Sequence, residues 1–157
     1  MPYFRAGQIQ NLSPTPSLTE GTGLFGVLKE FLFDKSKQNI PPAPLPSVKT
    51  DLLQLDRNKD ILVWFGHSSY FMQIESKRIL VDPVFSGNAS PLSFTTKSFA
   101  GTDQYEVSDL PDIDYLFITH DHWDHLDHQT ILQLKTKVKK IITGLGVGAH
   151  LIFWGFD

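Results

Sequence analysis

The sequence contains no cysteine among its 157 residues, which excludes disulfide bonds, thiol catalysis and thiolate metal ligands. It has no apolar run of membrane-spanning length, and its N-terminal residues lack the apolar stretch of a secretory signal. Neither sign of charge dominates, because 14 basic residues face 17 acidic ones for a net charge of −3. This balance gives no electrostatic reason to expect a nucleic-acid partner. The absences together predict a soluble, cytoplasmic, globular protein.

Residues 1–47 are predicted to form an arm that precedes the main domain. Leu24, Val27, Leu28 and Phe31 recur at helical spacing and predict a short amphipathic helix. Four prolines then exclude a helix in the following stretch and favour an extended connector. We interpret the apolar stripe as a surface that docks on the domain, with peripheral membrane contact as the alternative.

Residues 48–157 have the pattern of a layered α/β domain. Short runs rich in β-branched and aromatic residues predict antiparallel strands, and a later strand, helix and strand predict a β-α-β unit. The stretch 86–109 is rich in Ser, Thr, Gly and Asn and predicts a long surface loop. The predicted strands span 61–65, 70–75, 78–82, 115–119 and 140–143, and the predicted helices 128–138 and 149–156.

Two further patterns have a plain and a functional interpretation. Four lysines between positions 135 and 140 crowd the end of the predicted helix. We interpret them as solvated cations that suit the helix dipole rather than as a nucleic-acid patch. Gly144, Gly146 and Ala149 formally match a dinucleotide-binding fingerprint. We interpret them as a tight turn, because the acidic residue expected about 20 positions later would lie beyond the last residue.

The chemically informative segment follows the predicted buried strand and contains His120, His122, Asp124 and His125. In extended backbone His120 and His122 project to the same side, and a turn can bring Asp124 and His125 back to the same point. Imidazole nitrogen and carboxylate oxygen suit zinc, and also iron, manganese or nickel. One ion with a bound water, or two ions that share a hydroxide, would supply a nucleophile. The plain alternative is a surface cluster with ordinary hydrogen bonds.

The order His-x-His-x-Asp-His in residues 120–125 resembles the signature of the metallo-β-lactamase-fold hydrolases. Residues 64–91 and 112–130 further resemble the branch that contains N-acyl-phosphatidylethanolamine phospholipase D. The resemblance runs from about residue 60 to residue 157. It implies an αββα sandwich, of which this chain is the N-terminal half.

The resemblance also implies roles for the residues of the motif. His120 and His122 match the pair that ligates a first metal ion. Asp124 and His125 match ligands of a second ion. Asp124 is also the candidate catalytic residue that accepts the proton of the nucleophilic water.

Four residues outside the motif have weaker assignments. Asp82 matches a family aspartate at a strand end and is expected to support a metal ligand, with a cap on the following turn as the alternative. His67 lies on the hairpin that the family places near the site, where we expect a structural hydrogen bond or contact with substrate. His128 is interpreted as a surface or capping histidine, and His150 has no predicted partner.

The resulting hypothesis is a metal-dependent hydrolase with one or two zinc ions, iron or manganese being alternatives. The resemblance favours a phosphodiester or phospholipid-like substrate, thus a small-molecule or lipid-like partner. The family takes further ligands from its second half, and the sequence ends before any of them. We therefore expect a fragment, a half completed by another chain, or an inactive protein. The alternative function is a non-catalytic half-domain that binds partners or dimerises through its uncovered sheet.

Overall fold

The computed structural model describes residues 4–5, 8–9, 13, 23–33, 40–92 and 94–157 and divides into two units, 1–40 and 41–157. In the first unit, β1 (Phe4–Arg5) pairs antiparallel with β2 (Gln8–Ile9), and α1 spans Leu24–Phe33. The predicted helix is therefore present, although the side chains of Leu24 and Phe31 lie outside the described ones. Among the described helices, none is both long enough and apolar enough to cross a bilayer.

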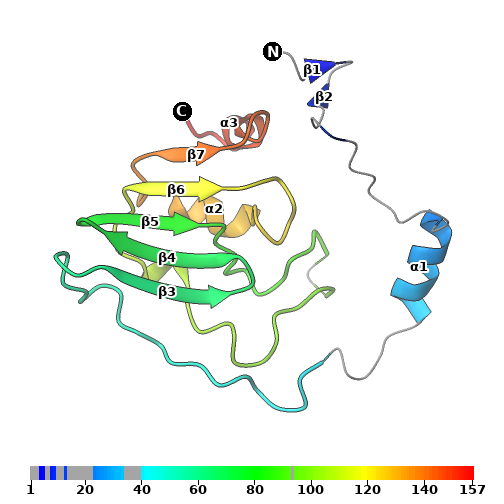
Figure 1. Cartoon of the computed structure of the whole chain (residues 1–157), viewed down its shortest axis with the longest axis horizontal. Helices are drawn as coiled ribbons and strands as arrows, with labels where there is room; N and C mark the ends of the chain where they lie inside the picture. Colours follow the sequence, from blue (N-terminus) through cyan, green and yellow to red (C-terminus); the bar gives the residue numbers. More distant parts are fainter. Residues whose placement is uncertain (1–3, 6–7, 10–12, 14–22, 34–39, 93) are drawn as a thin grey trace. The chain divides into compact units, whose positions relative to one another are not determined.

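The second unit is built on a mixed five-stranded sheet whose strands follow one another in sequence order (Figure 1). The first three strands are antiparallel and the last three are parallel. The strands are β3 (Ile61–Gly66), β4 (Ser69–Ile74), β5 (Lys77–Val81), β6 (Tyr115–Ile118) and β7 (Ile141–Thr143). They coincide with the predicted strands to within a few residues, and the α/β layering is confirmed.

Alternation along the strands decides which side chains form the core. Phe71 of β4 pairs with Leu80 of β5, and both are completely buried on the face that α2 (His128–Leu134) covers. Ile131 and Leu134 of α2 complete this layer. Figure 1 shows α2 behind the sheet, so the core lies between this helix and the strands.

The β-α-β unit is present, but α2 is shorter than predicted. It ends at Leu134 and not at Val138, because Val138 forms a parallel bridge with Ile113 and enters the sheet layer. The backbone N–H of Ile113 donates to the carbonyl of Lys137 at 2.8 Å. A helical residue could not make this pairing at the same time.

Three of the four lysines after α2 make specific hydrogen bonds, although all but Lys137 are also exposed to solvent. Lys137 donates to the carbonyls of Val107 and Leu110 at 3.0 and 2.6 Å. Lys135 donates to the carbonyl of Gly155. Their cationic groups therefore tie three separate segments together, which the local sequence pattern did not reveal.

Two other boundaries differ from the prediction. The segment 86–109 is not wholly a surface loop, because it ends in the short 3-10 helix η2 (Val107–Asp109) and buries Val107. The last helix, α3, spans Gly148–Phe153 and stops earlier than predicted. Gly155 has φ +84°, and this left-handed conformation ends the helical path.

Asp114, at the start of β6, should contribute pH-dependent stability. The hydrogen bond from Lys139 (2.7 Å), followed by the one from the backbone N–H of Arg78 (2.9 Å), holds the pKa of this carboxyl below its usual value. Its contribution is therefore present above the unfolded pKa of about 3.9 and is lost as pH falls through the folded pKa. We expect Asp114→Ala to lower the free energy of unfolding by about 1–3 kcal/mol at pH 7. Urea unfolding at pH 7 and below pH 4 should show the difference shrinking in acid.

Candidate metal centre

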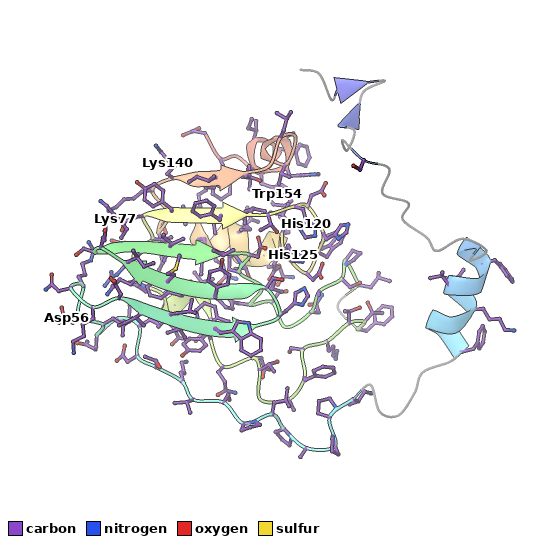
Figure 2. All side chains as sticks on the ribbon, in the orientation of Figure 1. Asp56, Lys77, His120, His125, Lys140 and Trp154 are labelled. Atoms are coloured by element: carbon purple, nitrogen blue, oxygen red, sulfur yellow. The ribbon has the colours of Figure 1, made fainter. Side chains whose placement is uncertain are left out.

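The histidine-rich motif begins where β6 ends and forms a loop that leads into α2. Figure 2 shows His120 and His125 beside each other at the end of the sheet toward which β6 points. Their ring centroids are 3.9 Å apart, and the rings of His120 and His122 are 4.6 Å apart. The backbone N–H groups of His125 and Leu126 both donate to the carbonyl of His122, at 3.0 and 2.7 Å. These turns fold the motif back on itself.

Asp82 holds one side of this loop from the end of β5. Its carboxylate is 1% exposed and accepts the backbone N–H and hydroxyl of Thr119 at 2.8 and 2.6 Å. The same carboxylate lies 2.8 Å from Nδ1 of His125. With the proton on Nδ1, the lone pair of His125 is on Nε2, which is the atom that can bind a metal. Asp82 therefore fixes both the orientation and the tautomer of His125.

The Thr119 hydroxyl also fixes the orientation and the tautomer of His120. Its proton is donated to Asp82, so its oxygen can accept from Nδ1 of His120, which lies 2.9 Å away. This arrangement places the lone pair of His120 on Nε2 as well. One hydroxyl thus connects the buried carboxylate to two motif histidines.

His67 reaches the motif from the turn between β3 and β4. Its Nε2 lies 2.9 Å from Oδ2 of Asp124, and its ring centroid is 5.1 Å from that of His125. Burial alone would raise the pKa of Asp124. A hydrogen bond from its own backbone N–H, the nearby ring of His125 and the hydrogen bond from His67 together outweigh burial and lower this pKa. Asp124 is therefore an ionised acceptor at neutral pH.

Among the described residues, His67, Asp124 and His125 have potential ligand atoms that all lie within 4.8 Å of one another. His120 lies close to this group through its ring contact with His125, whereas His122 is exposed and contacts His120. Two imidazole nitrogens and a carboxylate oxygen are a donor set that fits zinc, iron or manganese. The residues present therefore fit a metal ion.

The remaining histidines lie apart from this cluster. Nε2 of His150 is 3.5 Å from Oδ2 of Asp121, and the ring of His128 packs at 4.6 Å on Trp154. The sequence offered no partner for His150, because Asp121 lies far from it in the chain. The sequence analysis did not predict that Thr119 helps to orient the motif histidines. Its position directly before His120 was the feature that could have indicated this role.

A cavity of about 830 Å³ opens beside the cluster, and His67 and Asp124 belong to its lining. Phe65, Phe85 and Tyr105 form an aromatic wall, with the Phe65 ring centroid 5.2 Å from Phe85 and 4.7 Å from Tyr105. The predicted loop 86–109 supplies much of the remaining lining. The cluster is thus accessible from a space large enough for a small-molecule ligand.

The fold and the motif agree with the comparison to protein families. Residues 77–156 match the family described as the Beta-lactamase superfamily domain. The chain therefore belongs to this superfamily and has a metallo-β-lactamase-type α/β fold, as its motif predicted.

Several known proteins are similar to the chain. An uncharacterized protein of Mycobacterium tuberculosis is 32% identical over 98% of this chain and 42% of its own length. N-acyl-phosphatidylethanolamine-hydrolyzing phospholipase D 1 of Caenorhabditis elegans is 30% identical over 71% of this chain and 33% of its own length. A metal-dependent hydrolase of Caldivirga maquilingensis is 32% identical over 48% of this chain and 27% of its own length. The chain thus spans less than half of the length of each.

Among solved structures, the diiron beta-hydroxylase CmlA from Streptomyces venezuelae aligns with a TM-score of 0.46 and 28% identity. The alignment covers 63% of this chain and 20% of that protein.

Proposed function

We propose that the chain carries the metal-binding motif of a metal-dependent hydrolase that acts on a phosphodiester or phospholipid-like substrate. The observation that carries the proposal is the convergence of Asp124 and His125 at a strand end, with the tautomer of His125 set by a buried carboxylate. His120 and His122 are the proposed ligands of a first ion, and Asp124 and His125 of a second. Zinc is the proposed metal, with iron or manganese compatible with the same donors.

The proposed roles follow from the positions of the side chains. A bound ion would supply Lewis acidity and lower the pKa of water from about 15.7 toward 7. Asp124 is ionised at neutral pH and 40% exposed at its side chain, so it can accept a proton from water that enters the cavity. Asp82 and Thr119 keep the lone pairs of His125 and His120 available.

The substrate class is supported by the cavity and by the name of one relative. The cavity is lined by both aromatic rings and polar residues, and the exposed Lys97 is one of the lining residues. This combination suits a ligand that has both an apolar part and an anionic group such as a phosphodiester. The C. elegans relative is named as a phospholipase.

The first test is metal content together with hydrolysis. We expect the purified chain to retain zinc, iron or manganese and to gain thermal stability when the metal is restored after chelation. A bis(p-nitrophenyl) phosphate assay tests the reaction class, with Asp124→Asn as the variant expected to lose turnover. Absence of bound metal and of any metal-dependent shift in melting temperature would contradict the proposal.

A second candidate function is association through the open face of the sheet. The side chains on the face opposite α2 are largely apolar, and Leu62 and Trp64 are 65% and 68% exposed. Strand pairing places these side chains in adjacent rows. The rows contain Leu62, Trp64, Tyr70, Met72, Ile79, Tyr115, Phe117 and Ile142.

A continuous apolar face of this kind favours burial against another protein surface. We expect the chain to self-associate in size-exclusion chromatography with light scattering, and Leu62→Glu to shift it toward monomer. A wild-type chain that is monomeric at all concentrations and melts cooperatively would remove this candidate.

A further inference from the structure

His67 is held in an unusual backbone conformation at the β3–β4 turn. Gly66 has φ +113° and His67 has φ +47°, so a non-glycine residue occupies the left-handed region next to the candidate site. The indole Nε1 of Trp64 donates to the carbonyl of His67 at 2.9 Å and fixes the turn. Left-handed residues other than glycine persist where the surrounding structure imposes them, and they concentrate at functional sites. The turn thus presents this imidazole from an element outside the motif.

The separations around Asp124 match those between ligands of one metal ion. Bonds of about 2.0–2.1 Å in tetrahedral geometry put neighbouring ligand atoms roughly 3.3 Å apart. Oδ2 of Asp124 lies 2.9 Å from Nε2 of His67 and 3.5 Å from Nε2 of His125. The potential ligand atoms of all three residues lie within 4.8 Å of one another. Small side-chain adjustments would therefore bring the three atoms around one ion. Nε2 of His67 bonds to the ionised Asp124 in this structure, so binding also requires the ring proton of His67 to move to Nδ1.

The exposure of His67 argues against a purely structural role. Its side chain is 61% exposed, and an exposed hydrogen bond or ion pair to a carboxylate contributes about 0–1 kcal/mol to stability. Such a gain is no larger than the cost of holding a non-glycine residue in the left-handed region. A ligand that faces the cavity leaves a coordination position open to water, which is the arrangement of catalytic metal sites.

We propose that His67 is itself a metal ligand and completes, with Asp124 and His125, a three-ligand site made entirely from this chain. The inference rests on the proposed function, since it adds a ligand to the same metal centre. It goes beyond the motif, because His67 is 57 residues from Asp124 in sequence.

The test is calorimetric titration of Zn²⁺ into the metal-free chain and its variants. His67→Gln keeps an amide donor that can bond to Asp124 but removes the imidazole ligand. We expect this variant to lose more than about 100-fold in affinity, beyond the range of about 10–100-fold for residues that only orient a ligand. His128→Gln removes a histidine that packs on Trp154 outside the cluster and should bind Zn²⁺ like the wild type.

The outcomes separate the inference from the function on which it rests. Wild-type affinity in His67→Gln, together with a large loss in Asp124→Asn, would overturn the ligand role of His67 and leave the metal centre in place. Failure of the wild-type chain to bind zinc, iron or manganese would instead contradict the proposed function itself. Long-range ¹H–¹⁵N imidazole NMR of the wild type needs no variant to fold. A Zn²⁺-induced shift of a His67 ring nitrogen is expected, and its absence when the His125 ring nitrogen shifts would overturn the inference.

Discussion

Asp82→Ala is expected to weaken Zn²⁺ binding by about 10–100-fold, although Asp82 does not face the proposed ion. Its carboxylate lies 2.8 Å from Nδ1 of His125 and accepts two hydrogen bonds from Thr119. Without it, His125 can rotate or adopt the other tautomer, and the Thr119 hydroxyl no longer has a fixed acceptor. His120 then loses its orientation as well, because it bonds to the same hydroxyl. Calorimetric titration of Zn²⁺ measures the combined loss.

Asp114→Ala is the matched control for this prediction. Asp114 is also a buried aspartate next to the sheet, but its partners are the backbone N–H of Arg78 in β5 and the ammonium group of Lys139, just before β7. It should therefore lower stability and leave the affinity for Zn²⁺ unchanged. Equal losses of affinity in the two variants would show that Asp82 acts through general destabilisation and not through His125.

Asp127→Ala is expected to cause the largest loss of stability, about 3 kcal/mol in the free energy of unfolding. Asp127 is 5% exposed and caps α2 by accepting the backbone N–H of Gln129 at 3.2 Å. Its second oxygen accepts the backbone N–H groups of Phe85 and Ser86 at 3.2 and 2.9 Å. Removal of the carboxylate deprives the N–H groups of Gln129 and Ser86 of this acceptor, while the N–H of Phe85 keeps only the Thr130 hydroxyl, at 2.9 Å. Urea denaturation followed by circular dichroism provides the measurement.

A conservative variant tests whether these hydrogen bonds are the cause. Asp127→Asn keeps one carbonyl oxygen and should lose clearly less stability than Asp127→Ala. Phe85 and Ser86 also line the cavity, so substrate binding should weaken in Asp127→Ala even where the chain stays folded. If the two variants were equally stable, the loss would have to come from packing and not from the unsatisfied donors.

The strands and the candidate metal motif were predictable because both are encoded locally. Hydrophobic alternation marks β3, β4 and β5, and the spacing of His120, His122, Asp124 and His125 is itself the signature of the family. Helix ends were less predictable. Leu134 ends α2 because Val138 pairs with Ile113, and no local pattern reports a pairing between distant segments.

The sequence by itself determined the superfamily, the order of strands and helices, and the motif that could hold a metal, since these depend on neighbouring residues and their periodicity. Only the tertiary structure decided which side chains orient that motif. Asp82 and His67 reach it from 43 and 57 residues away, and a contact at such separation depends on how the sheet brings strand ends together. The donor atoms of the motif therefore come from six consecutive residues. The histidine tautomers and the separations that allow these atoms to bind a metal depend on the end of β5 and on the β3–β4 turn.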